Sequence, residues 1–93
     1  MSSDLDVLLR AVGNSTRRLI LSIVWERDSA AGEIAAQIEL AAASVSEHLK
    51  VLRKAGLVTV DKQGTSWIYR AERSAITRLL ELLRDEFPEP ENK

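Results

Sequence analysis

Hydroxyl and cationic side chains share one face of a helical segment in the middle of the chain, within the stretch SVSEHLKVLRKAGLV. Val45, Leu49 and Leu52 recur at helical spacing and predict its buried face. Short side chains near the start of such a helix allow close approach, and the cations beyond them can bind phosphates. Because a major groove admits one α-helix, we predict a DNA-binding helix with these contact residues: Ala43, Ser44, Ser46, Glu47, His48, Lys50, Arg53 and Lys54.

Some of these residues have a second interpretation. Glu47 could accept a hydrogen bond from a cytosine amino group, or it could pair more simply with Lys50 three residues further on. His48 could be a half-buried packing residue bonded to nearby backbone, or it could contact a phosphate. The whole segment could also be a solvated amphipathic helix that happens to be rich in Lys and Arg.

Two arginines stand at the start of another helical segment, TRRLILSIVWERD. Cations at a helix N-terminus do not favour the helix dipole, so Arg17 and Arg18 need another explanation. A phosphate contact or a salt bridge across a dimer would supply one, and the alternative is that their stems cover apolar surface. We include Arg17 among the predicted DNA contacts. The buried stripe predicted for this helix includes Leu19, Ile20 and Val24.

After Gly56 the apolar spacing changes from helical to alternating. LVTV and SWIYR predict two strands, and DKQGT between them predicts a hairpin loop around Gly64. As a wing, this hairpin would lie over the minor groove or the adjacent DNA backbone, and otherwise it is an exposed turn. We expect Trp67 and Tyr69 to pack structurally, not to stack on bases. The predicted wing contacts are Lys62, Gln63 and Thr65.

Four helical segments before the hairpin and one after it give the order α-α-α-α-β-β-α. Two short helices joined by a tight turn and followed by a hairpin are typical of a winged helix-turn-helix, a mainly α fold with a β-hairpin wing. At 93 residues the chain is one domain, 1–93. Its predicted parts are dimerisation helices at about 4–12 and 74–87, a helix-turn-helix at about 31–55, a wing at about 57–70 and a frayed tail at 88–93.

Composition excludes several functions. The chain has no cysteine and one histidine, which excludes disulfides, thiolate metal sites and a multi-histidine metal centre within one subunit. We see no nucleophile–base pair or phosphate loop, so we predict neither an enzyme nor a cofactor. The acidic start does not resemble a secretion signal, and no segment has the apolar length of a membrane span. We expect a cytoplasmic protein with no membrane partner.

The charge distribution favours a polyanionic partner more than the net charge of −1 does. Residues 44–73 contain six Lys or Arg against three Asp or Glu, whereas the segment from residue 74 onward is net negative. A basic middle between acidic ends predicts one positive face.

The first and last helices carry more apolar residues than one small core can cover. We therefore predict that part of this surface forms a two-fold interface, although a self-packed monomer is the alternative. The predicted interface residues are Leu5, Leu8, Leu9, Val12, Ile76, Leu79, Leu80 and Leu83.

Three motifs together resemble those of ArsR-type (ArsR/SmtB) winged-helix repressors. NSTRRLIL is similar to their D-P-T-R-R-x-I-L, SEHLKVLRKAGLV to their S-x-H-L-K-x-L-x-x-A-G-L-V, and the wing to R-x-G-R-x-x-Y-Y. The resemblance covers about residues 5–87. It implies a homodimeric bacterial or archaeal repressor that binds double-stranded DNA at a two-fold symmetric operator through the first residues of the recognition helix and the wing tip.

The chain departs from the family pattern at several positions. Glu39 stands where glycine is common, and Ala41 where a serine cap is common, which weakens the helix start by about 1 kcal/mol. The metal boxes of the sensing members are absent, so the resemblance implies a member without metal sensing. A small molecule or a protein remains open as its effector. The alternative function is a winged-helix protein-interaction module that has lost DNA binding, which Glu39, Ala41, Ala42 and Glu47 favour.

Overall fold

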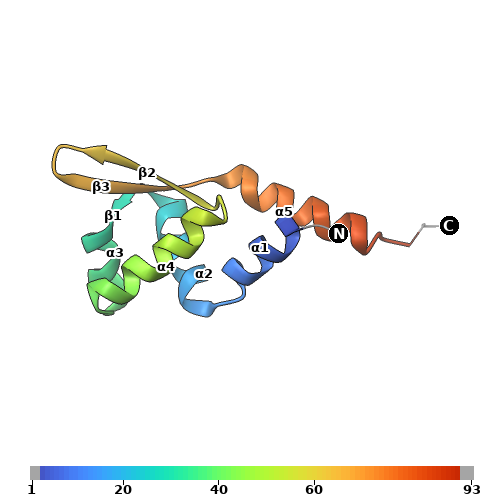
Figure 1. The fold of residues 1–93 in the computed structure, drawn as a ribbon, viewed down its shortest axis with the longest axis horizontal. Coiled ribbons are helices and arrows are strands. Elements are labelled where there is room, and N and C mark those ends of the chain that lie inside the picture. Colours follow the sequence, from blue (N-terminus) through green and yellow to red (C-terminus); the bar gives the residue numbers. More distant parts are fainter. Residues whose placement is uncertain (1–2, 91–93) are drawn as a thin grey trace.

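Five helices and a three-stranded sheet build residues 3–90, the part of the chain that this computed structural model describes (Figure 1). The fold is the predicted winged helix-turn-helix, drawn out to 55 × 26 × 22 Å because the hairpin and the last helix point away from each other. Of the predicted tail, residues 88–90 have no regular structure and 91–93 lie outside the described range. The elements are α1 (Ser3–Val12), α2 (Ser15–Glu26), β1 (Ser29–Ala30), α3 (Ala31–Ile38), α4 (Ala42–Lys54), β2 (Val58–Gln63), β3 (Ser66–Ala71) and α5 (Arg73–Glu86).

The strand β1 is an element that the sequence did not predict. Between the second and third helices Ser29 pairs antiparallel with Tyr69 and is only 2% exposed. The strand order is therefore β1-β3-β2, and the element order is α-α-β-α-α-β-β-α. Two residues are too few to show an alternating pattern. The short strand attaches the start of α3 to the middle of β3.

The hairpin is tighter than predicted. Its strands continue to Gln63 and from Ser66, which leaves only Gly64 and Thr65 as the turn instead of the five residues expected. Gly64 has φ 62° and Thr65 has no positive φ, as in a type II′ turn with glycine at its first central position. The register places Lys62 opposite Trp67.

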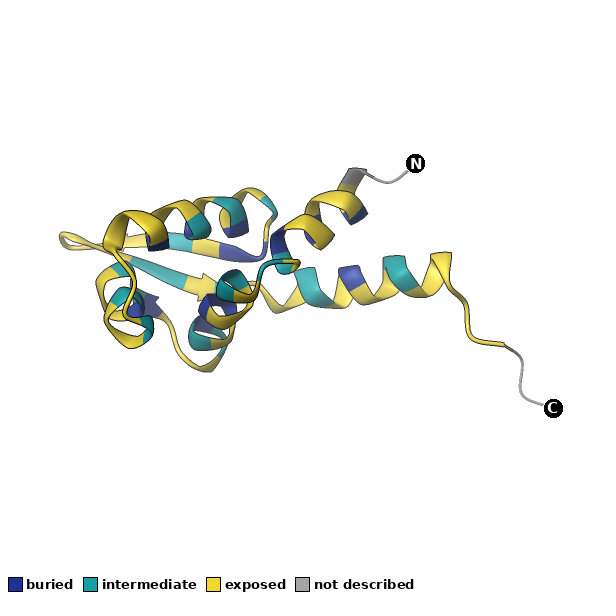
Figure 2. Ribbon diagram, turned by 90° about the horizontal axis from the view of Figure 1, so that it is seen from below, coloured by how far each residue is buried: buried dark blue, intermediate teal, exposed yellow. Residues whose placement is uncertain are grey.

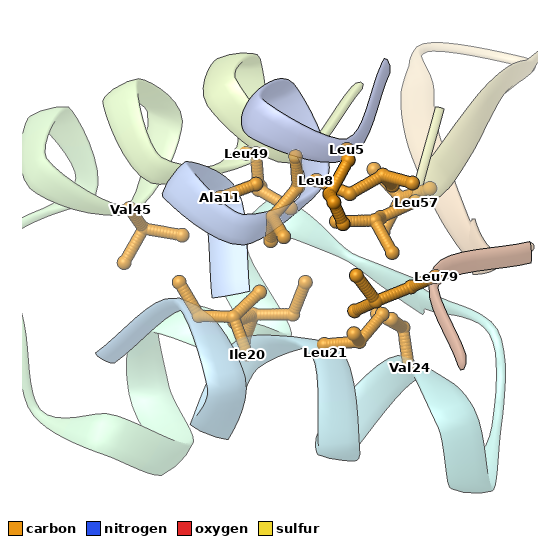
Figure 3. Close-up of a cluster of buried hydrophobic side chains, with 13 residues drawn as sticks. Leu5, Leu8, Ala11, Ile20, Leu21, Val24, Val45, Leu49, Leu57 and Leu79 are labelled. Carbon is orange, nitrogen blue, oxygen red and sulfur yellow. The ribbon is translucent and has the colours of Figure 1, made fainter. Parts of the chain in front are cut away.

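The core lies where α1, α2, α3, α4, α5 and the sheet meet (Figure 3). The predicted inner face of α4 is confirmed, since Val45, Leu49 and Leu52 are at most 1% exposed. On α2 the prediction for Leu19 was wrong. Leu19 is 48% exposed, and Leu21 is buried in its place.

The ends of α2, α3 and α4 differ in how well they are capped. The side chain of Asn14 accepts a hydrogen bond from the backbone N–H of Arg17 (3.0 Å) and caps α2. In contrast, the N-cap residue of α4 is Ala41, whose side chain can make no hydrogen bond to the free N–H groups of the helix. Glu39, which ends α3, has φ 55° and is the only described non-glycine residue with a positive φ. The position where the family commonly has glycine is therefore one whose backbone conformation favours glycine.

Within residues 3–90, no helix combines the length and the apolar character needed to cross a membrane.

Replacing Glu39 with glycine should stabilise the protein. The left-handed conformation costs an L-residue about 1–2 kcal/mol, part of which glycine returns through its more flexible unfolded state. We expect Glu39→Gly to raise the free energy of unfolding in urea by about 1 kcal/mol. Glu39→Ala removes the same exposed carboxylate but keeps Cβ, and should give no such gain. Equal stabilities of the two variants would contradict the assignment of strain to this position.

Candidate nucleic-acid interface

The outer face of α4 is open to solvent along its length. The buried stripe of Val45, Leu49 and Leu52 fixes which side of the helix faces inward, and the other predicted contact residues lie on the remaining sides. Figure 2 shows this division between buried and exposed residues on the packed helices. The exposed predicted contacts on α4 are Ala43, Ser44, Ser46, Glu47, Lys50, Arg53 and Lys54.

The three cations of α4 have no competing partner. None of Lys50, Arg53 and Lys54 makes a side-chain hydrogen bond or an ion pair with another described residue. Arg53 and Lys54 lie in the last turn, where a positive charge also favours the helix dipole. These side chains could therefore bind phosphates without breaking an existing contact.

Glu47 does not pair with Lys50, contrary to our simpler interpretation. The described residues form two salt bridges, Asp28 with Arg70 (3.0 Å) and Asp4 with Arg78 (2.9 Å). The carboxylate of Glu47 is exposed and unpaired among the cations of α4. It lowers the positive potential there and leaves an acceptor that could meet a base amino group.

Two of the six cations counted between residues 44 and 73 are used inside the fold. Arg70 donates to Asp28 (3.0 Å), and Arg73 lies over the Trp25 ring (4.4 Å to its centroid) while donating to the Trp25 carbonyl (2.6 Å). The sequence count therefore overstates the free positive charge of this region. The remaining cations are those of α4 and Lys62 of the wing.

Arg17 and Arg18 hold the end of α1. Arg17 donates through Nε to the Ala11 carbonyl and through Nη2 to the Arg10 carbonyl, both at 2.8 Å. Arg18 donates to the carbonyl of Val12 (2.6 Å). The last carbonyls of a helix lack intrahelical partners and carry partial negative charge, so two arginines that start the next helix are well placed to cap them. The guanidinium of Arg17, which we predicted to contact DNA, is thus occupied within the protomer.

His48 is half-buried, as one of its two interpretations predicted, but its partner is a side chain and not nearby backbone. Its Nδ1 lies 3.4 Å from Nη1 of Arg17. Sequence reasoning could not find this pair, since the two residues are 31 positions apart and belong to separate motifs.

The wing presents an aromatic–cation pair in addition to its polar tip. Gln63 and Thr65 are exposed as predicted for a tip, and Lys62 Nζ lies 5.3 Å from the ring centroid of Trp67. Tyr69 packs against the core, whereas Trp67 is 53% exposed and packs on the face of the hairpin against Lys62 of the neighbouring strand. Trp67 and Tyr69 lie on the same face of β3, and Trp67 is the one nearer the hairpin tip. Its ring attracts the Lys62 ammonium and holds it near the tip.

The residues predicted for the dimer interface divide into two groups. Leu5, Leu8 and Leu79 are no more than 6% exposed, so the core of the protomer itself covers them. Leu9 (40% exposed) and Leu80 (55% exposed) face outward. The remaining members, Val12, Ile76 and Leu83, are half-buried. An apolar groove of about 380 Å³ runs between α1, α2 and α5, and its lining includes Val12, Leu21, Trp25, Ile76 and Leu79.

No three His, Asp or Glu side chains within residues 3–90 gather into a cluster that could hold a metal ion.

The same arrangement of elements occurs in known regulators. Residues 14–60 match the family described as "Bacterial regulatory protein, arsR family". The chain is 32% identical over 77 residues to the transcriptional activator HlyU of Vibrio cholerae, which covers 83% of this chain and 71% of that protein. An ArsR-like transcriptional regulator from Rhodococcus sp. RHA1 has the same fold, with a TM-score of 0.83 and 25% identity over 89% of this chain and 78% of that one.

A third comparison concerns the fold alone. The homodimeric winged helix-turn-helix DNA-binding domain of a Mycobacterium bovis protein has a TM-score of 0.76 at 24% identity, over 90% of this chain and 81% of that one. Together these neighbours confirm the winged helix-turn-helix, and the matching regulators agree with the prediction that the chain is not an enzyme.

Proposed function

Because the chain belongs to the arsR family of bacterial regulatory proteins, we propose that it is a homodimeric, sequence-specific transcriptional repressor that binds a two-fold symmetric operator. The observation that carries this proposal is the outer face of α4. There, short side chains at the start of the helix are followed by Lys50, Arg53 and Lys54, which are exposed and have no partner among the described residues. Such a surface fits the major groove of duplex DNA.

Two-fold symmetry supplies the second half of the binding surface. Leu9 and Leu80 are large apolar side chains left exposed by the protomer, and pairing with a second copy would cover them. The Mycobacterium bovis domain with the same fold is a homodimer. In such a dimer the two α4 helices enter successive major grooves about 34 Å apart. A dimer bound over a promoter represses by excluding other proteins from it.

We further propose that this repressor does not sense metals. The chain has no cysteine and a single histidine, and that histidine is already engaged with Arg17. Soft metals and zinc are usually bound through several cysteines or histidines, and the chain has only the one histidine. Release from DNA would then depend on a small molecule, on a protein partner, or on the concentration of the repressor itself.

Glu47 favours a second candidate function, a winged-helix module that binds proteins and not DNA. Its unpaired carboxylate lies among the cations of α4 and would repel phosphates. Charge reversal on α4 separates the two functions, because only DNA binding depends on these cations through counterion release.

Lys50→Glu should weaken binding to operator DNA by at least tenfold. A charge that meets a phosphate contributes to the salt dependence of the affinity, so the slope of log K against log salt should also decrease by about one unit per protomer. Fluorescence anisotropy with DNA selected from random sequence, at several salt concentrations, measures both quantities.

Arg27→Glu is the matched control for this experiment. This variant reverses one exposed charge at the C-terminal end of α2 and changes the net charge by the same amount as Lys50→Glu. It should nevertheless leave specific binding nearly unchanged. Equal losses in the two variants would indicate a general charge effect. Unchanged binding in Lys50→Glu, or equal affinity of the wild type for scrambled DNA, would favour the protein-interaction module.

Leu80→Glu should convert the dimer into folded monomers. The side chain is 55% exposed in the protomer, so a carboxylate there costs little for folding but would be buried without a partner in the dimer. Sedimentation velocity should show a monomer at concentrations where the wild type is a dimer, and operator affinity should decrease accordingly.

Leu40→Glu tests whether any exposed leucine gives this result. Leu40 is 39% exposed in the turn between α3 and α4, away from α1 and α5, so this variant should remain dimeric. A dimeric Leu80→Glu protein would contradict the placement of the interface on α5.

A further inference from the structure

One guanidinium connects the predicted dimerisation helix with the DNA-binding helix. Arg17 lies in the first turn of α2, donates to the Arg10 and Ala11 carbonyls at the end of α1, and approaches Nδ1 of His48 on α4 through Nη1 (3.4 Å). A half-buried arginine with three fixed contacts on two neighbouring helices has little freedom to move. The position of His48 is therefore tied to the end of α1.

The chemistry of the two side chains fixes their roles in this contact. A guanidinium has five N–H donors and no acceptor, so Nδ1 of His48 must accept the hydrogen bond. The proton of the neutral ring is then on Nε2, because the two ring nitrogens of a neutral imidazole divide the donor and acceptor roles. Arg17 thus selects one tautomer of His48.

The protonated nitrogen is left available at the protein surface. Nε2 of His48 has no hydrogen-bond partner among the described residues, and none of their buried side-chain nitrogens or oxygens lacks a partner. An unpartnered Nε2 must therefore be accessible to solvent. His48 lies at the flank of α4, between the buried stripe that contains Leu49 and the exposed Glu47.

We infer that Arg17 is a positioning residue that holds His48 with its Nε2–H directed outward as a hydrogen-bond donor to a DNA phosphate. This inference rests on the proposed DNA-binding function and names a contact within it. A donor at the flank of a helix lying in the major groove faces the sugar–phosphate strand at the groove wall. Arg17 acts on DNA only through His48.

The contact also gives α1 an influence on DNA binding. Leu9 and Val12 of the proposed dimer surface lie in the last turn of α1, next to the carbonyls that Arg17 holds. A movement of this helix end would carry the guanidinium with it and turn or release the His48 ring. Assembly of the dimer and presentation of the donor are therefore coupled through one side chain.

Non-additivity between Arg17 and His48 is the test of this inference. Operator affinity is measured for Arg17→Met, His48→Ala and the double variant. Each single change should weaken binding by about tenfold, and the double change by no more than either single one, because both remove the same phosphate contact. The salt slope should stay at the wild-type value, since neither change removes a cation that touches DNA. Additive losses, or a smaller slope in Arg17→Met, would mean that Arg17 contacts DNA itself.

Arg18→Met is the matched control for lost capping. Arg18 also caps α1, through the Val12 carbonyl, but makes no contact with His48. Both arginine variants should lose similar stability in urea, whereas only Arg17→Met should lose operator affinity. Equal losses of affinity would reduce Arg17 to a structural role and overturn the inference.

His48→Gln tests whether a side chain with a similar donor and acceptor can replace His48 in DNA binding. Its amide keeps one acceptor and one donor, so binding should stay within about threefold of the wild type when Arg17 is present, and should fall to the level of His48→Ala when Arg17 is methionine. Loss of binding in His48→Gln with intact Arg17 would contradict the donor–acceptor assignment.

A measurement on the free protein separates this inference from the proposed function. A long-range proton–nitrogen NMR spectrum at about pH 8 should show the proton of His48 on Nε2, and the Nδ1 resonance should shift in Arg17→Met. A proton on Nδ1 would exclude the contact whether or not the protein binds DNA. Conversely, the expected spectrum together with no affinity for any operator would leave the contact in place and reject the DNA-binding function.

Discussion

Burial of the inner face of α4 is the interaction on which the rest of the structure depends. Val45, Leu49 and Leu52 are almost completely removed from water and pack with Ile20 and Ile34 of α2 and α3. Each such side chain contributes about 1.5–3 kcal/mol of apolar burial, far more than any surface contact of the helix. This burial fixes the rotation of α4 about its axis and so decides which side chains remain outside.

The positive charge that the outer face offers depends on which cations are already paired within the fold, and not on how many the sequence contains. Arg70 and Arg73 belong to the basic stretch of the sequence but are held by Asp28 and Trp25, and Arg17 is held by backbone carbonyls. Within residues 44–73 the cations that remain without a hydrogen bond or ion pair are consequently those of α4 and Lys62. A protein with a small net negative charge can thus offer a local positive surface to a polyanion, because the range of electrostatic interaction at physiological salt is only about 8 Å.

The sequence was most informative where a pattern repeats and least informative where one contact decides. The stripe of α4, the helix order and the glycine of the hairpin turn follow from periodicity and turn chemistry, so they could be predicted. β1 could not, because two residues carry no period and their pairing with β3 is a long-range event. The Arg17–His48 contact could not be predicted from the sequence either, because it depends on how α1, α2 and α4 pack. Leu19 and Leu21 both match a helical apolar pattern, and only the packing of α5 and α1 decides that Leu21 is inside.

The shortness of β1 affects how readily the protein could aggregate through its sheet. It pairs only with Ile68 and Tyr69 in the middle of β3, so in the outer half of the hairpin Ser66 and Trp67 have no strand beside them on that edge, and β2 is the other edge strand of the sheet. Open strand edges are templates for edge-to-edge association with other chains. Asp61 and Lys62 place opposite charges on that outer half, and the tight turn keeps it short. The charged residues of the wing therefore also act as gatekeepers, which keep an exposed hairpin from seeding intermolecular β-sheet.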